Sequence, residues 1–408
     1  MENTVRLLRT GRPKVDESLA GYVIRLAEQN GYPTASWIFD LAGLDRINTN
    51  HHLCSVAFKS PECLRGLSRL TGISLKELAR LVYARADTPR RAPLYKFFGH
   101  PVHQYVIRPL SVTLCPECLS ESPYCRRVWE MSLVTTCPKH LRRLVDECPR
   151  CQKPISYIRA SVCRCSCEFD FRALSAPPVS NAEAALSRRI HSLCDLNAGV
   201  PTNANGRSPV TALGLHELVS VVLFIASQHQ GLSGATGKKI ARGMRNAELH
   251  ALYTKAYSVF EDWPSNYYEF LDWRRARERK GSAVRCGSKA GLGQDFGNFY
   301  GGLYRFFSSD EYEFLRSAFG EYLVGRWEAM YVPSLSRWKN LPRMRGSNRY
   351  VSRSEARQLL GVNYKLIDQY VEANRLTALV RGSGRERSFL IEVSSLARLK
   401  RELDHSPA

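Results

Sequence analysis

The chain has 408 residues, which is enough for two or three domains, and its 44% of hydrophobic residues is ordinary for a globular protein. The formal net charge of +21 predicts a polyanionic partner, most often nucleic acid. A membrane-surface protein would show a basic amphipathic helix with an exposed apolar face, and no clear one occurs. The apolar run Leu218 to Ala226 is too short to span a bilayer and predicts a buried helix. Because the N-terminus also has no apolar signal-peptide core, we expect a soluble, cytoplasmic protein. The segments described below predict helices more often than strands, so we expect the mainly α class.

Residues 1–110 predict a helical domain that begins with a flexible basic lead at residues 1–15. From Leu19 to Ala27, apolar residues recur at three- and four-residue spacing, which predicts an amphipathic helix. Asp16 or Ser18 can cap this helix, and Gly31 ends it. Residues 35–44 predict another short helix.

Residues 64–84 have helix-turn-helix spacing. A first helix from Leu64 to Leu70 is followed by a turn with Gly72, and Ser74 can cap a second helix whose buried stripe includes Leu78 and Val82. Helix pairs of this kind bind DNA in some proteins and form a core or a protein-binding surface in others. The sequence leaves both interpretations open.

Residues 111–175 predict a double zinc-binding module, because nine of the thirteen cysteines lie between Cys115 and Cys167, mostly as close pairs. Two residues between ligands let a tight turn direct both side chains at one tetrahedral ion, and two such pairs make one structural zinc site. In sequence order, we assign the first site to Cys115, Cys118, Cys137 and His140, and the second to Cys148, Cys151, Cys165 and Cys167. Cys163 could replace Cys165, and Cys125 is expected to be buried or free.

Two other uses of these cysteines are disfavoured. Disulfides would need an oxidising compartment, and a redox CxxC motif would be flanked by a βαβ pattern that this region lacks. Both sites have four ligands, whereas a catalytic zinc keeps one position open for water, so we expect two structural Zn2+ ions. Trp129 is expected to cover the metal cluster. Arg126 and Arg127 have two interpretations, a contact with a polyanion or a solvated face.

A linker region is predicted at residues 176–208, with the polar segment 197–208 as its best candidate, followed by a helical domain at residues 209–335. Within this domain we expect an irregular glycine-rich segment at residues 281–302 and helices at residues 213–227, 246–263, 266–280 and 308–330. The basic run at residues 274–280 either lies along a phosphate backbone or is a solvated helix end.

Residues 336–408 predict a basic winged helix-turn-helix, which resembles the MerR/excisionase-like type. Ser352 and Glu355 form a capping-box pattern, Gly361 lies in the turn, and a second helix is predicted from Tyr364 to Ala373. Two short strands, at residues 376–380 and 388–393, would flank a glycine-rich wing. Residues 337–401 hold 15 Lys and Arg against 5 Asp and Glu, a net +10, which is nearly half of the excess charge.

In such a module the second helix enters the major groove, and the wing reaches the backbone or the minor groove. The residues expected to face bases or phosphates are Asn363, Tyr364, Lys365 and Gln369 from the helix, and Arg381, Arg385 and Arg387 from the wing. Phosphate contacts would dominate the affinity and make it depend on salt. The other interpretation is a protein-binding module whose arginines are solvated.

Together these parts resemble the TniQ/TnsD family of transposition target-site selectors over nearly the whole chain. The segment DESLAGYVIRLAEQNGY (residues 16–32) is similar to the family's opening motif, and CPECL, YCRRVW, CPKH and CPRC are similar to its double zinc-finger signature. The family's last pair often reads CxCG followed by an acidic residue, whereas this chain has CSCEFD, with Glu168 at the glycine position. That departure favours Cys165 and Cys167 as ligands.

The resemblance implies a non-catalytic adaptor. Such a protein marks a DNA site or rides on a guide-RNA complex with a CRISPR effector, and it recruits an AAA+ ATPase regulator of the TnsC/TniB type, which brings the transposase. It also implies a bacterial, nucleoid-associated protein. Relatives include homodimers, so a homodimer is one candidate, and the sequence leaves the oligomeric state open. The lack of P-loop, GxSxG and HExxH motifs agrees with a protein that is not an enzyme. The competing functions are a stand-alone zinc-containing transcriptional regulator and a zinc-containing nuclease or recombinase.

Overall fold

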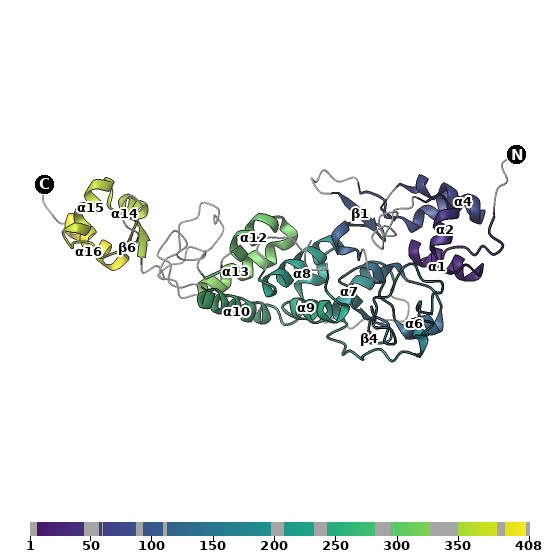
Figure 1. Ribbon diagram of the computed structural model, residues 1–408. Helices are drawn as coiled ribbons and strands as arrows, with labels where there is room; N and C mark the ends of the chain where they lie inside the picture. Colours follow the sequence, from purple (N-terminus) through teal and green to yellow (C-terminus); the bar gives the residue numbers. More distant parts are fainter. Residues whose placement is uncertain are drawn as a thin grey trace. The chain divides into compact units, whose positions relative to one another are not determined.

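A computed structural model describes residues 6–44, 57–58, 60–86, 93–108, 112–196, 208–231, 243–281, 295–296, 298–326, 350–381 and 388–404. The chain divides into two compact units, Met1–Asp262 and Trp263–Ala408. The protein is mainly helical with few short strands, which confirms the predicted fold class (Figure 1). Among the described helices, none has both the length and the apolar character that crossing a bilayer requires. The domain boundaries drawn from the sequence stay predictions.

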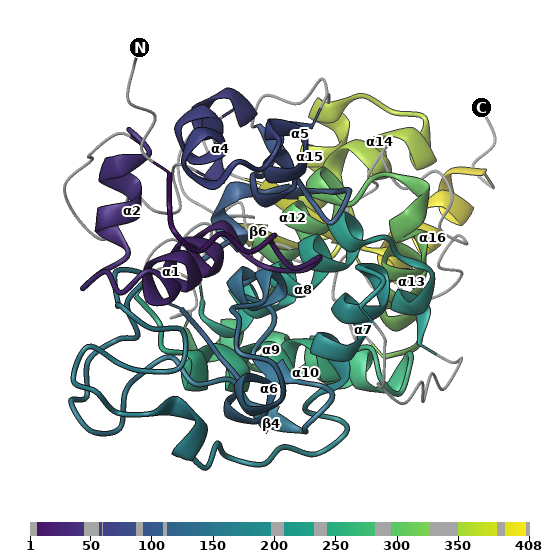
Figure 2. The ribbon, with the colours of Figure 1, turned by 90° about the vertical axis from the view of Figure 1, so that its right-hand side faces the viewer.

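The first helix forms where the sequence predicts it. α1 (Leu19–Gln29) is capped by Ser18, whose Oγ accepts a hydrogen bond from the backbone of Gly21 at 3.0 Å, and its residues up to Ala27 are buried. Gly31 turns the chain after this helix with a φ of 70°. α2 (Ser36–Leu41) follows and contacts both α1 and α4 (Arg65–Thr71) (Figure 2).

Residues 6–17 follow a defined path along α1, so the prediction of a flexible lead is wrong for its described part. The backbone N–H of Arg9 donates to Asn30 Oδ1 at 2.9 Å, and Asn30 Nδ2 donates back to the Arg9 carbonyl at 2.8 Å. Tyr22 and Arg25 donate to two further carbonyls of the segment, at 3.0 and 2.9 Å. Polar side chains of α1 and of its C-cap residue Asn30 therefore hydrogen-bond to main-chain groups of residues 9–12, which have no partner in a regular helix or strand.

The helix-turn-helix-like pair is present, with a shorter second helix than expected. α4 ends at Gly72, whose φ is 72°, and Ser74 caps α5 (Leu75–Leu78) by accepting from the Glu77 N–H at 3.3 Å. The chain tightens into 3-10 turns on both sides of the pair, η1 (Pro61–Leu64) and η2 (Ala79–Leu81). The second helix is thus a single α-turn followed by a 3-10 turn.

A β-hairpin that the sequence does not predict follows this pair. β1 (Leu94–Phe97) and β2 (His100–His103) are antiparallel, and the two residues between them, Phe98 and Gly99, both have positive φ, 48° and 85°. Two positive φ values in succession are what a tight two-residue hairpin turn needs. Phe97 is fully buried and explains why these short strands pack against the domain.

The middle of the first unit is built from short elements. They are η3 (Gln104–Val106), α6 (Pro116–Glu121), η4 (Arg127–Glu130), β3 (Thr136–Cys137), β4 (Arg142–Arg143), η5 (Phe171–Ala173) and α7 (Ala185–Leu193). The unit ends with η6 (Pro209–Ala212), α8 (Leu215–His229) and α9 (Asn246–Ser258), and α8 is buried along most of its length, as its apolar run predicts. Residues 197–207 of the predicted linker lie outside the described residues.

The second unit begins with α10 (Ser265–Gly281), α12 (Asn298–Phe306), η7 (Asp310–Tyr312) and α13 (Glu313–Gly325) around an aromatic core. Residues 298–302 of α12 lie at the end of the segment that is predicted to be irregular, and this correction has a simple cause. Residues 282–294 and 297 of that segment lie outside the described residues. Phe299, Leu303 and Phe307 recur every four residues and are all buried, and this pattern outweighs the glycines between them. In the basic run of α10, Arg274 is buried and Arg275 lies 3.6 Å from Asp295, so these two arginines do not form a solvated helix end.

The C-terminal elements include two helices joined by a tight turn and strands on both sides of the predicted wing, and residues 382–387 of that wing lie outside the described residues. The elements are β5 (Tyr350–Ser352), α14 (Arg353–Leu360), α15 (Tyr364–Glu372), β6 (Ala378–Arg381), β7 (Ser388–Glu392) and α16 (Val393–Asp404), with the strands antiparallel in the order β5-β7-β6. The capping box of Ser352 and Glu355 is present, and Gly361 ends α14 with a φ of 68°. β5 and α16 are additions to the predicted pattern. Ala356, Ile367 and Ile391 are fully buried at the centre of this small core.

Candidate metal centres and nucleic-acid interface

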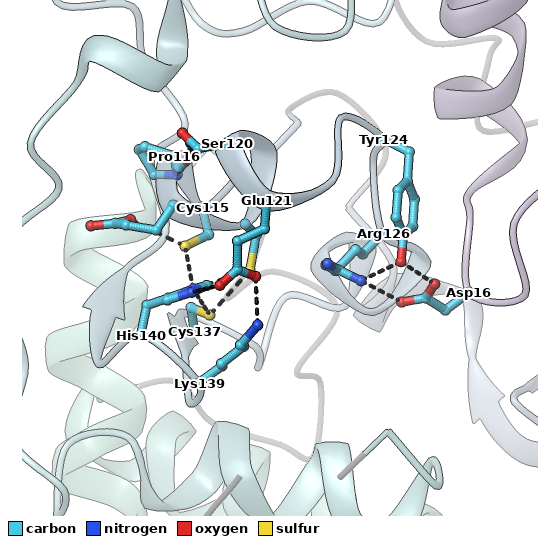
Figure 3. Close-up of polar contacts among 12 residues, drawn as sticks. Asp16, Cys115, Pro116, Ser120, Glu121, Tyr124, Arg126, Cys137, Lys139 and His140 are labelled. Carbon is cyan, nitrogen blue, oxygen red and sulfur yellow. Dashed lines mark hydrogen bonds and ion pairs between the residues drawn. The ribbon is translucent and has the colours of Figure 1, made fainter. Parts of the chain in front are cut away.

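The first cysteine cluster is formed by a helix and a two-stranded hairpin. Cys115 precedes α6 and Cys118 lies in its first turn, with Pro116 at the first helical position, where a proline removes no helical hydrogen bond. Cys137 ends β3, and His140 follows in the turn to β4. Each side of the cluster therefore supplies two ligands, as the spacing predicts (Figure 3).

The four side chains of this first cluster converge. His140 Nδ1 lies 3.3 Å from Cys118 Sγ and 3.5 Å from the sulfurs of Cys115 and Cys137. Cys118 Sγ lies 3.6 Å from Cys137 Sγ. Tetrahedral zinc, with bonds of about 2.3 Å to sulfur and about 2.0–2.1 Å to nitrogen, places neighbouring donor atoms roughly 3.5–3.8 Å apart. The donor atoms and their spacing therefore fit one zinc ion.

The electrostatics of the cluster also call for a cation. Hydrogen bonds from Cys115 and Cys118 hold the pKa of the Cys137 thiol well below its usual range. Hydrogen bonds with Cys118 and Cys137 raise the pKa of Cys115. One thiolate thus suppresses the ionisation of its neighbours, and a divalent cation held by these residues would supply the charge that lets all three thiols ionise to the form that binds zinc.

Two carboxylates on α6 support the ligands, and the sequence analysis does not identify them. Glu121 Oε1 lies 2.9 Å from His140 Nε2, so it orients the imidazole with Nδ1 toward the sulfurs. Glu117 lies 3.3 Å from Cys115 Sγ and accepts from Arg142 Nε at 2.9 Å. The available signal is helical spacing, because Glu121 lies three residues after Cys118 on the same helix face.

The second cluster brings together Cys148, Cys151, Cys165 and Cys167, whose donor atoms all lie within 4.8 Å of one another. Cys148 Sγ lies 3.6 Å from Cys167 Sγ, and Cys151 Sγ lies 3.8 Å from Cys165 Sγ. Cys163 lies outside this group and is buried, and burial raises the pKa of its thiol to about 11. Of the two alternatives, the geometry therefore favours Cys165.

Three of the four ligand pairs are followed by a residue in the left-handed backbone region. The φ angles are 50° at Leu141, 55° at Gln152 and 65° at Glu168. In the second cluster this turn lets Gln152 N donate to the Cys148 carbonyl at 2.8 Å and Glu168 N to the Cys165 carbonyl at 2.9 Å. A side chain in this conformation costs roughly 1–2 kcal/mol. Glu168 therefore adopts the conformation for which a glycine is suited.

The two arginines between the first ligand pairs are structural. Arg127 is buried, donates to the Arg80 carbonyl, and its guanidinium lies 5.7 Å from the ring centre of Tyr83. Arg126 forms an ion pair with Asp16 at 3.2 Å (Figure 3). Neither predicted interpretation fits Arg127, because partners distant in the sequence enclose it. Trp129 is buried, and its predicted role as a cover for the metal stays a prediction.

The cysteine-rich module packs directly on the first helix. Ser18 N donates to the Cys125 carbonyl at 3.0 Å, and a Cβ added to Gly21 would lie 2.6 Å from Cys125 Cβ, so that only glycine fits there. Cys125 is buried, as expected, and its sulfur accepts a hydrogen bond from Arg159 Nη2 at 3.2 Å. The module is therefore continuous with the N-terminal helices within the first unit.

In the C-terminal module, two of the predicted nucleic-acid contacts already have internal partners. Asn363 caps α15 by accepting from Leu366 N at 2.9 Å. Tyr364 is 43% exposed, and the guanidinium groups of Arg353 and Arg357 each lie 5.0 Å from the centre of its ring. The module therefore presents on its surface an aromatic ring with two arginine guanidinium groups beside it.

Of the other predicted contact residues of this module, some are described by the structure and some are not. Lys365 and Gln369 are exposed and lie one turn apart on α15, so they share a face of the second helix. Arg381 is the last residue of β6. Arg385 and Arg387 of the wing lie outside the described residues. The contacts of all these side chains with nucleic acid stay predictions.

A family model described as TniQ matches residues 8–144, a range that contains α1, the helix-turn-helix-like pair and the first cysteine cluster. The match supports a TniQ/TnsD-family protein and confirms the resemblance for the motifs within these residues, whereas CPRC and the C-terminal module lie beyond them. A search among curated proteins found no match.

Proposed function

We propose that this chain, which carries a TniQ domain over residues 8–144, is a non-catalytic target-site selection adaptor in DNA transposition. The TniQ domain implies a transposition-associated role in target selection. The finer proposal is that the chain links a target DNA site, or a guide-RNA complex with a CRISPR effector, to an AAA+ ATPase regulator of the TnsC/TniB type that recruits the transposase. The domain match is the observation that carries this proposal.

We further propose that the two clusters hold two structural Zn2+ ions. The first would use Cys115, Cys118, Cys137 and His140, and the second Cys148, Cys151, Cys165 and Cys167. Both sets supply four ligands, which fits structural rather than catalytic zinc. Bound zinc supplies folding free energy to a segment made of short elements. The chain's own residues position the ligands through the α6 carboxylates and the left-handed turns described above.

The basic C-terminal module is proposed to contact the target nucleic acid. The exposed stripe of Lys365 and Gln369 on α15 supports this role, and so does the module's excess of Lys and Arg. The double variant Arg385→Ala/Arg387→Ala should weaken DNA binding and flatten its salt dependence by about 0.9 per lost phosphate contact. The matched control removes two exposed cations of α16 instead, Arg398→Ala/Lys400→Ala. An unchanged salt slope in the wing variant would indicate that the module binds protein.

The test of the whole proposal is reconstituted transposition with the transposase, the ATPase regulator and this chain. Leaving the chain out should abolish targeted insertion while untargeted insertion persists. Equally targeted insertion without the chain would contradict the proposal. Size-exclusion chromatography with light scattering would test the homodimer, and fractionation with chromosomal DNA would test the nucleoid association.

A stand-alone transcriptional regulator is the second candidate, because a winged helix-turn-helix is also the DNA-binding module of many regulators. Footprinting distinguishes the regulator from the target-selection adaptor. A regulator protects a promoter sequence without transposition partners, whereas the adaptor binds the ATPase regulator and directs insertion. Purified protein that cleaves DNA in the presence of metal would support the nuclease instead.

A further inference from the structure

The N-terminal segment from Arg6 to Lys14, hereafter the basic strap, is held by its main chain and leaves its cationic side chains outside. Its contacts with Asn30, Tyr22 and Arg25 engage backbone groups of the strap. Within the strap, the side chain of Leu7 is buried, and its N–H donates to the Leu70 carbonyl at 2.9 Å. The side chains of its four basic residues are exposed, namely Arg6, Arg9, Arg12 and Lys14. This architecture fixes the strap while leaving its charges available.

The strap lies beside the helix-turn-helix-like pair, which adds four exposed cations, namely Arg65, Arg69, Lys76 and Arg80. Arg12 Nε lies 3.7 Å from Glu77 on α5, although the Arg12 side chain is still 83% exposed. A Cβ added to Gly72 would lie 3.9 Å from Arg6 Nη1, so this guanidinium lies over the turn between α4 and α5. These two contacts join the strap and the pair into one surface, and Figure 2 shows α4 and α5 close to one another in the same unit.

The charge on this surface is strongly unbalanced. Residues 6–15 and 65–80 together hold eight Lys and Arg residues and a single carboxylate, Glu77. Cations gathered in this way repel one another and raise the local concentration of a polyanion. Arg6, Arg9 and Arg12 recur every third residue along an extended chain, which spaces them by up to about 10 Å. A row of this kind matches the repeated charges of a linear polyanion better than it matches one compact acidic cluster.

We propose that the basic strap and the exposed faces of α4 and α5 bind the phosphate backbone of nucleic acid, as a second contact surface separate from the C-terminal module. Arginine suits this task because its planar guanidinium donates two parallel hydrogen bonds to a phosphate. The single-turn α5 favours backbone contact over the reading of bases in a groove, which uses a longer recognition helix. The proposal deepens the proposed function, since a target selector must meet nucleic acid, but its binding test does not depend on transposition.

The experiment compares four versions of the full chain. Arg6→Gln/Arg9→Gln alters the strap, Arg65→Gln/Arg69→Gln alters α4, and the quadruple variant combines them. The control, Lys153→Gln/Arg164→Gln, removes two exposed cations of the cysteine-rich module. Because the strap is held by its main chain, these substitutions leave its anchoring bonds in place, and circular dichroism and zinc content verify the fold. Fluorescence anisotropy then measures the affinity for a duplex DNA and for a single-stranded RNA as a function of salt.

The quadruple variant should lower the magnitude of the slope of log K against log salt by about 3–4 on duplex DNA, or by about 3 on a single strand, and the control should change it by less than about 1. The nucleic acid whose binding the quadruple variant weakens more, duplex DNA or single-stranded RNA, is identified as the source of the phosphates. Equal effects of the control and the strap variants would overturn the proposal, because total charge would then explain them. Unchanged binding combined with lost targeting in reconstituted transposition would assign the surface to an acidic protein partner, and would leave the proposed function intact.

Discussion

Arg108 and Asn246 are 138 residues apart in the sequence, and Arg108 Nη2 donates to Asn246 Oδ1 at 2.6 Å in the buried interior of the first unit. The amide nitrogen of Asn246 donates in turn to the carbonyls of Thr135 at 3.0 Å and Leu144 at 2.6 Å. These carbonyls flank the hairpin of β3 and β4 that carries Cys137. A single buried amide therefore connects the first residue of α9 to the first cysteine cluster.

Replacing Asn246 by alanine should destabilise the first unit by about 3 kcal/mol, because it removes three buried hydrogen bonds, from Arg108 Nη2 and to the carbonyls of Thr135 and Leu144. Thermal unfolding of the full chain would show this as a lowered midpoint. The control Ala251→Gln changes an exposed position of the same helix and should stay within about 0.5 kcal/mol of the parent. A loss at Asn246 no larger than that of the control would mean that α9 docks by apolar contacts alone.

Zinc content should follow the two clusters independently. The parent chain should bind two zinc ions, and Cys118→Ser and Cys151→Ser should each bind one, because each removes one ligand from a different cluster. Inductively coupled plasma mass spectrometry on protein dialysed against metal-free buffer measures this directly. Cys163→Ala is the matched control and should keep both ions. A control that loses an ion while Cys165→Ala keeps two would reverse the choice between these neighbouring cysteines.

Acid should destabilise the first unit partly through His191. Burial lowers the pKa of this histidine to about 4, so the unfolded chain, with an ordinary histidine, binds a proton at a higher pH than the folded chain does. The stability is therefore fully present above about pH 6.5 and falls as the pH drops toward 4, by about 2 kcal/mol between pH 7 and pH 5.

The comparison of the parent with His191→Leu at each pH isolates this contribution, because release of zinc by acid affects both proteins alike. The difference in unfolding free energy between the two should shift by about 2 kcal/mol in favour of the variant from pH 7 to pH 5. A constant difference over this range would show that His191 keeps its proton affinity in the folded chain.

Local patterns explain what the sequence could predict. The spacing of Cys115 and Cys118, the glycine turn at Gly72 and the capping box at Ser352 each depend on a few neighbouring residues, and all appear in the structure where they were expected. The eight residues of the two clusters can also be predicted from local patterns, because a short turn forms each pair. Joining the pairs in sequence order predicts the same two groups of side chains that lie together in the structure, and their binding of metal stays a prediction.

Long-range contacts explain what the sequence could not predict. The burial of Arg127 depends on Arg80 and Tyr83, more than 40 residues before it, and the path of the basic strap depends on the side chains of α1. A basic residue with a distant partner has the same local pattern as a solvated one. The helix α12 differs from the prediction for another reason. Its glycine-rich composition predicts irregular structure, whereas the buried period of Phe299 and Leu303 favours a helix.

Glu168 provides the last prediction, because its backbone is left-handed with a φ of 65° at the turn after Cys167. Glycine adopts this conformation without the contact between Cβ and the carbonyl oxygen that makes it unfavourable for other residues. Glu168→Gly should therefore stabilise the zinc-loaded chain by about 1 kcal/mol and tighten the second cluster's hold on zinc against a competing chelator. The side chain contributes little in return, since its ion pair with Arg164 is 3.4 Å long and exposed.

Glu168→Gln keeps a Cβ and removes the charge, so it should match the parent in both measurements. If glutamine and glycine raised the stability equally, the charge of Glu168 beside the cysteine thiolates would be the cause, and the backbone conformation would not.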